Sequence, residues 1–211
     1  MLLAHQLDCS PSRFRIWPEA LVGDDDAETF RSLVAARAGG RPLAYITGER
    51  EFWSLPLKVT PDTLIPRPDT ETLVDTALAC PLPASARVLD VGTGSGAVAL
   101  ALARERPGWH VTASETSGGA LAVAATNART LGLDLTFVEG EGLAPFDGEY
   151  WDLIVSNPPY IPEDDPHLAQ GDLRYEPIGA LAAGADGLDV IRALIARAPE
   201  RLNRGGWLLL E

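Results

Sequence analysis

Short apolar runs alternate with longer stretches of helical periodicity from residue 87 to the end of the chain. The short runs have the length of buried strands, and the longer stretches repeat apolar residues at intervals of three and four. The predicted strands are 87–91, 109–115, 134–139, 151–156 and 206–210, and the predicted helices are 97–106, 118–131 and 187–202. Strands joined by helices form a parallel sheet covered on both faces, so the pattern predicts an α/β fold with a Rossmann-like, mostly parallel sheet.

The chain before this region divides into two further parts. Residues 1–50 contain short helical stretches separated by Pro and Gly, and they predict a small helical domain in which Asp26 caps a helix. Residues 51–68 begin with alternating apolar and polar side chains around Pro56 and predict a β-hairpin with a linker. We assign the remaining residues, 69–211, to the α/β domain.

A proline-rich segment, Ile65–Glu71, connects the hairpin to that domain. Its prolines fix φ and predict a rigid elbow that presents Arg67. Asp69 or Thr70 is predicted to cap the helix that follows and runs to about Ala79.

The chain has 211 residues, enough for one or two domains with a sizeable core. Its 30 Asp and Glu outnumber its 17 Lys and Arg, giving a net charge of −13. Such a chain repels a phosphate backbone, so direct binding of nucleic acid is not expected. No apolar run approaches the length of a membrane span and no secretory signal precedes the first helix, so we expect a cytoplasmic protein without membrane contact. We also expect a monomer.

A glycine-rich turn, DVGTGSG, follows the first strand of the predicted sheet. Glycines permit positive φ and let backbone N–H groups approach a ligand closely, so this turn predicts a cofactor site at the carboxyl end of the strand. The candidate cofactor-binding residues of the turn are Asp90, Gly92, Thr93, Gly94, Ser95 and Gly96.

Two further carboxylates extend this site. Glu115 ends the next strand, a position from which an acidic side chain reaches ribose hydroxyls, and Glu141 follows the third strand, within reach of an adenine amine. The carboxylate of Asp90 would oppose a pyrophosphate, whereas it suits an ammonium and a sulfonium. The site therefore favours S-adenosylmethionine over a dinucleotide.

A second candidate site follows the fourth strand at the same sheet edge, in the sequence Ser156-Asn157-Pro158-Pro159-Tyr160. The prolines remove two N–H donors and leave the Asn157 side-chain oxygen and the Pro158 carbonyl as acceptors for the hydrogens of an NH2 group. The ring of Tyr160 offers a flat face for a planar amide or base. Holding both hydrogens favours a pyramidal nitrogen aimed at a methyl donor, so we expect methyl transfer to nitrogen, with Asn157 contacting cofactor and substrate.

The three histidines are scattered, and no HExxH motif or spaced His/Cys cluster occurs. We therefore assign no metal site.

The combination of DVGTGSG, SNPPY, LIPRPDTE and the upstream EFWSLPLKVT resembles the HemK/PrmC family of protein-glutamine N5-methyltransferases. The resemblance implies a class I S-adenosylmethionine-dependent methyltransferase fold with an N-terminal domain that recognises the substrate. The implied substrate is the GGQ glutamine of class-1 peptide chain release factors, received by residues 157–160, with Arg67 on the substrate-facing rim. It also implies that Gly142 lies beside the adenine.

The chain departs from that family's pattern in four ways. Gly142 stands where relatives often have a larger side chain near the adenine. Glu115 stands where the family has aspartate, which lengthens the arm toward the ribose by one methylene. The chain also ends at Glu211 within the fifth strand, whereas the implied fold has two more, so we expect a methyltransferase domain that lacks its C-terminal strands. Its N-terminal domain is likewise shorter than the family norm.

Three alternative functions stay open at this point. An N6-adenine nucleic-acid methyltransferase also uses an NPPY sequence to hold an exocyclic NH2 group. A glutamine methyltransferase of a ribosomal protein would share every motif. An inactive, truncated remnant would keep the motifs without the activity.

Overall fold

A computed structural model describes residues 1–211, which divide into two compact units, Met1–Gly48 and Glu49–Glu211. The predicted division into three parts stays a prediction, and in the structure the hairpin counts with the second unit. None of the helices combines the length and the apolar composition that a membrane span requires.

The first unit is helical and consists of α1 (Leu2–Gln6), α2 (Arg13–Ile16), α3 (Asp24–Ala38) and α4 (Leu43–Thr47). The prediction that Asp26 caps a helix is wrong, because α3 already begins at Asp24 and Gly23 occupies the capping position. Three aspartates thus fill the first turn, where negative charge is favourable beside the exposed N–H groups. Asp26 instead accepts a hydrogen bond from Gln6 Nε2 at 3.0 Å, which joins α1 to α3.

The second unit contains a five-stranded sheet in the order β5-β4-β3-β6-β7, with parallel pairing throughout. Its strands are β3 (Arg87–Val91), β4 (His110–Glu115), β5 (Thr136–Glu139), β6 (Trp151–Ser156) and β7 (Leu202–Leu210). Its helices are α5 (Glu71–Ala79), α6 (Ala97–Glu105), α7 (Gly118–Leu131) and α8 (Asp189–Arg197). The predicted α/β class is confirmed.

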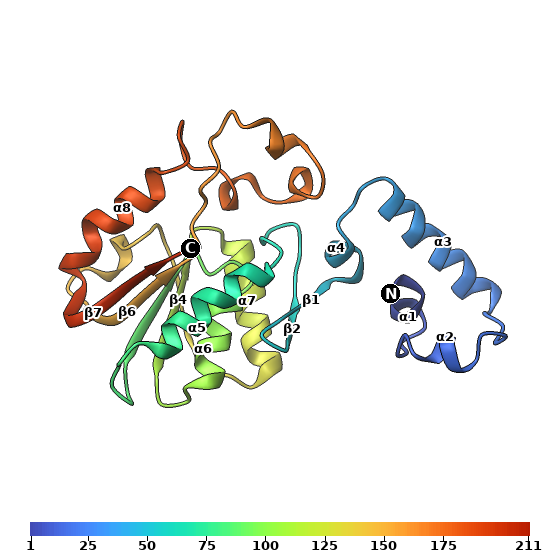
Figure 1. Ribbon diagram of the computed structural model, residues 1–211, viewed down its shortest axis with the longest axis horizontal. Coiled ribbons are helices and arrows are strands. Elements are labelled where there is room, and N and C mark those ends of the chain that lie inside the picture. The colour runs from blue at the N-terminus through green and yellow to red at the C-terminus, as the bar shows by residue number, and fades with distance from the viewer. The chain divides into compact units, whose positions relative to one another are not determined.

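Alternating strand residues supply two separate cores, one on each face of the sheet. Val88 and Leu153 pack with α5 and α6, whereas Leu89 and Ile154 pack with Leu194 of α8. Figure 1 shows α5, α6 and α7 on one side of the sheet and α8 on the other. The period of two along each strand thus places helices on both faces, as a parallel sheet requires.

Helix α8 is shorter than predicted, and β7 begins earlier. The helix ends at Arg197, a 3₁₀ turn follows at Ala198–Glu200, and β7 starts at Leu202. Pro199 lacks an N–H donor and cannot continue an α-helix, which explains the early end. Gly187 has φ +78°, which is not a right-handed helical conformation, so α8 also begins later than predicted, at Asp189.

The predicted hairpin is present as β1 (Glu49–Phe52) and β2 (Leu55–Lys58), which pair antiparallel outside the main sheet. Both residues of its turn, Trp53 and Ser54, have positive φ, the geometry of a type I′ turn. The Trp53 backbone N–H donates to Glu71 Oε1 at 3.0 Å, so the turn is attached to α5.

A buried asparagine of α7 joins the hairpin to the glycine-rich turn. Asn127 Oδ1 accepts the Lys58 N–H at 2.8 Å, and Nδ2 donates to the carbonyls of Lys58 and Ser95 at 3.0 and 2.8 Å. One side chain thereby satisfies three backbone groups, two of Lys58 and one of Ser95, and fixes the turn against the hairpin.

We predict that Asn127→Ala lowers the free energy of unfolding by about 3 kcal/mol, because it leaves buried backbone donors and acceptors unpaired. Thr130→Ala is the matched control, since Thr130 is exposed and bonds only within its own helix. Chemical denaturation measures both. A loss for Asn127→Ala no larger than that of the control would contradict this role.

Candidate functional site

The two candidate motifs meet at a cavity of about 630 Å³ beyond the carboxyl ends of β3 and β6. The strand order reverses between these two neighbours, and such a point is where open parallel sheets bind ligands. The volume lies in the range of small-molecule and cofactor sites. Of the predicted residues, those that line it are Gly92, Gly94, Glu115, Glu141, Gly142, Asn157, Pro158 and Pro159.

The glycine-rich turn begins where β3 ends, and its three glycines all have positive φ, +73° at Gly92, +57° at Gly94 and +88° at Gly96. A Cβ on Gly96 would also lie 2.9 Å from Leu100 Cδ1. Glycine is thus required there both for the backbone and for packing against α6.

Asp90 organises the turn from inside the protein and is not among the residues that line the cavity. Its Oδ2 accepts hydrogen bonds from Thr93 Oγ1 at 2.7 Å and from the Ala99 N–H at 3.1 Å. Burial raises the pKa of Asp90 to about 6, the two hydrogen bonds oppose that shift, and the charge of Glu115 adds slightly to it. The carboxylate therefore ties the turn to the start of α6.

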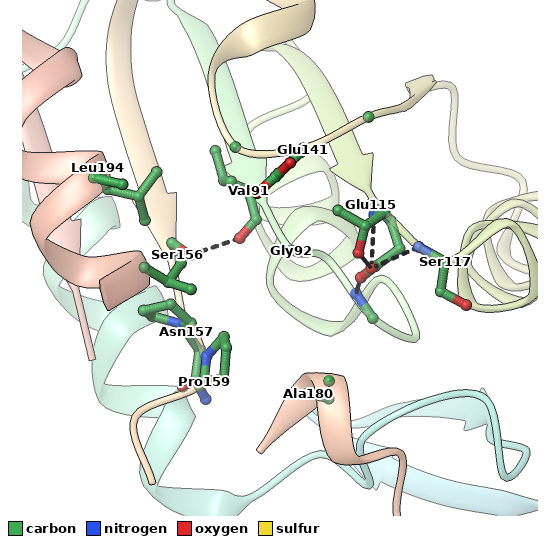
Figure 2. A pocket seen from close by; sticks show the side chains of 18 of the residues that line it. Val91, Gly92, Glu115, Ser117, Glu141, Ser156, Asn157, Pro159, Ala180 and Leu194 are labelled. Carbon is green, nitrogen blue, oxygen red and sulfur yellow. Dashed lines mark hydrogen bonds between the residues drawn. The ribbon is translucent and has the colours of Figure 1, made fainter. Parts of the chain in front are cut away.

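Glu115 lines the cavity, and its longer side chain folds back onto neighbouring backbone. Its Oε2 accepts the Gly94 N–H at 2.9 Å, and its Oε1 accepts the N–H groups of Thr116 and Ser117 at 2.8 and 3.1 Å. The Thr116 hydroxyl also donates to Oε1, so the remaining acceptor capacity is on Oε2. Figure 2 shows these bonds on the wall opposite Asn157.

The NPPY segment forms that other wall. Ser156 Oγ donates to the Val91 carbonyl at 2.6 Å and joins the ends of β6 and β3 beneath the cavity (Figure 2). Asn157 Nδ2 donates to Thr70 Oγ1 at 3.1 Å. Tyr160 is half exposed and does not line the cavity, and its N–H donates to the Leu181 carbonyl at 3.2 Å.

Arg67 does not line the cavity. Its Nη2 forms an ion pair with the buried Glu176, whose other oxygen accepts the Ile65 N–H at 3.1 Å. This contact fastens the proline-rich elbow to the loop that follows the NPPY segment. Thr93, Ser95 and Gly96 likewise lie outside the lining, and they shape the turn.

Of the two residues predicted to cap α5, Thr70 occupies the N-cap position, but its side chain forms no capping hydrogen bond. Pro68–Thr70 forms a 3₁₀ turn, and the helix begins at Glu71 without a side-chain cap. Thr70 occupies the capping position in a helical conformation, and its hydroxyl contacts Asn157 instead.

Several residues that line the cavity belong to none of the sequence motifs. Helix α8 contributes Val190, Ala193, Leu194 and Arg197, whose spacing of three, four and seven is the signature of one helix face. Asp62 and Leu64 come from the linker, which carries no motif of its own.

Negative charge dominates the lining, with four carboxylates, Asp62, Glu115, Glu141 and Asp189, against the single guanidinium of Arg197. Such a cavity favours a cationic ligand. Apolar walls of Val91, Leu143 and Leu194 provide room for a flat, uncharged group. The structure contains no cluster of three or more His, Cys, Asp or Glu suited to a metal ion.

Family models match both units. One, described as "Methyltransferase small domain", covers residues 69–170, and another, described as "PrmC N-terminal domain", covers residues 1–48. Among solved structures, the 16S rRNA methyltransferase RsmC of T. thermophilus aligns with a TM-score of 0.57 at 22% identity, over 77% of this chain and 40% of that one. Fold and family model together define a class I methyltransferase, as predicted.

Full-length relatives narrow the class. The release factor glutamine methyltransferases of Pseudomonas aeruginosa and of Xylella fastidiosa (strain Temecula1) are each 51% identical to this chain. Both alignments cover 100% of this chain and 77% of the relative. The chain therefore belongs to the release factor glutamine methyltransferase family, and the resemblance inferred from its motifs is confirmed.

We predict that Asp90→Asn becomes more stable relative to the wild type as pH rises. The pKa of Asp90 is about 6 in the folded protein against an ordinary value of 3.8. Below pH 3.8 the carboxyl is uncharged in both states and its burial does not lower the stability of the wild type, whereas above pH 6 the buried charge destabilises the fold by its full amount. Asparagine keeps an acceptor oxygen for Thr93 and Ala99 and carries no charge.

Between about pH 4 and about pH 7, the free energy of unfolding of the variant should rise by about 3 kcal/mol relative to that of the wild type. Chemical denaturation across this range measures it, and the same titration of the wild type supplies the reference for all other groups. Parallel stability curves would show that Asp90 is not buried as a charge.

Proposed function

We propose that this chain transfers the methyl group of S-adenosylmethionine to the N5 nitrogen of the GGQ glutamine in class-1 peptide chain release factors. The observation that carries the proposal is the single cavity shared by the glycine-rich turn and Asn157-Pro158. The names of the relatives support a release factor as substrate.

The lining fits S-adenosylmethionine in charge, shape and hydrogen bonding. The cofactor carries an ammonium and a sulfonium, which match the surplus of carboxylates, while the apolar residues Leu143 and Leu194 suit an adenine. The free capacity of Glu115 Oε2 suits a ribose hydroxyl. We assign cofactor binding to the Gly92–Gly94 turn, Glu115, and the loop of Glu141 and Gly142. When bound, the cofactor supplies a methyl group activated by a positively charged sulfur.

The wall of Asn157 and Pro158 supplies the acceptors for the substrate. An amide nitrogen is a weak nucleophile because its lone pair is delocalised into the carbonyl. The Asn157 side-chain oxygen and the Pro158 carbonyl would each accept one hydrogen of the glutamine NH2, which localises the lone pair on nitrogen and orients it toward the cavity. Once methylated, the nitrogen would give up one of these two hydrogens as a proton to solvent. The two prolines hold these acceptors in place because they fix the backbone.

We predict that Asn157→Ala lowers the rate of release factor methylation at least tenfold and leaves cofactor affinity within about twofold. The lost hydrogen bond acts mainly in the transition state and is worth about 1–3 kcal/mol. Transfer of a labelled methyl group measures the rate, and calorimetry measures the affinity.

Asn203→Ala is the control, because Asn203 is exposed on β7, outside the cavity lining, and bonds only to Asp152. Its rate should equal that of the wild type. Full activity of Asn157→Ala, or label transferred to DNA and not to the release factor, would refute the proposal. A protein that shows no heat with the cofactor would point to the inactive remnant.

A further inference from the structure

The amide group of Asn157 is held by a side chain that lies 87 residues earlier in the chain. From this contact we infer that Thr70 is a positioning residue, which sets the orientation of the Asn157 amide for methyl transfer. The inference rests on the proposed function in one respect, since it assumes that Asn157 presents its oxygen to a substrate NH2 group.

In the structure, this hydrogen bond occupies the nitrogen end of the Asn157 amide. Asn157 lines the cavity, and its Nδ2 donates to Thr70 Oγ1 at 3.1 Å. With the nitrogen bound there, Oδ1 is the end left to accept a hydrogen from a substrate. The reversed amide would set an NH2 group against the NH2 of the substrate, an arrangement of donors without an acceptor.

The backbone of Asn157 needs no such help, because Pro158 already restricts the residue before it to extended conformations. The freedom that remains is rotation of the side chain about its own bonds. Thr70 removes that freedom from outside the NPPY segment. The NPPY motif therefore restricts the backbone of Asn157, and Thr70 sets the orientation of its side-chain amide.

Thr70 is itself well suited to this task. It is only 5% exposed, and its N–H donates to the Arg67 carbonyl at 3.2 Å within the 3₁₀ turn. The ion pair of Arg67 with the buried Glu176 fastens the same turn to the loop beyond the NPPY segment. The elbow thus contacts the chain after β6 at two points, Asn157 and Glu176. Because the elbow is rigid, the Thr70 hydroxyl that binds the Asn157 amide is held in place.

The test is a double-mutant cycle in the full chain. Thr70→Val keeps the shape of the side chain and removes the hydroxyl, and we expect it to lower kcat for release factor methylation about 3- to 10-fold with cofactor affinity unchanged. Thr70→Ser keeps the hydroxyl and should stay within about twofold of the wild type. Thr76→Val, at an exposed threonine of the helix α5 that follows, is the control and should have no effect.

Combination with Asn157→Ala separates positioning from general structure. A residue that acts through Asn157 has nothing left to position there, so Thr70→Val should change kcat by less than about twofold in that background. An equal loss in both backgrounds would overturn the inference, as would an unchanged kcat for Thr70→Val alone.

A spectroscopic measurement keeps the inference testable without activity. In a ¹⁵N-labelled protein, the side-chain amide signal of Asn157, identified by its loss in Asn157→Ala, should shift in Thr70→Val and keep its position in Thr70→Ser. If the wild type fails to methylate a release factor while this pattern holds, the proposed function is wrong and the contact is real. An unshifted signal in Thr70→Val would show that Thr70 does not hold the amide.

Discussion

The adjacency of β3 and β6 in the middle of the sheet is the constraint on which the site depends. The two strands run parallel, but the chain leaves β3 toward α6 on one face, whereas the segment after β6 leads to α8 on the other. Their following segments therefore separate and leave a cavity between them. The hydrogen bond from Ser156 to the Val91 carbonyl joins the strand ends and forms the base of that cavity.

Each wall of the cavity is fixed by buried polar side chains. Asp90 and Asn127 hold the glycine-rich turn, and Thr70 holds Asn157. Because an unpaired polar group in the interior is costly, such side chains define one arrangement of the loops and not several. The site is therefore preorganised by groups that do not themselves face a ligand, with Glu115 as the exception that does both.

The sequence predicts the sheet and the location of the site well, and it predicts the contacts of individual side chains poorly. Periodicity and the glycine turn give the order of strands and helices and bring the two motifs to one sheet edge, although the bounds of α8 and β7 differ from the prediction, since element order depends on local pattern and on parallel topology. Asp90 shows the limit: its acidity pointed to a ligand, whereas its surroundings turn it inward to Thr93 and Ala99. Arg67 is similar, because its partner Glu176 lies 109 residues away, a pairing that no local pattern reveals.

The most direct test of the account is mass spectrometry of a purified class-1 release factor after incubation with this chain and S-adenosylmethionine. We expect one added methyl group, on the side-chain nitrogen of the glutamine in the GGQ peptide and on no other residue. A methyl group on a different residue, or an unmodified GGQ peptide from a folded protein that binds the cofactor, would contradict it.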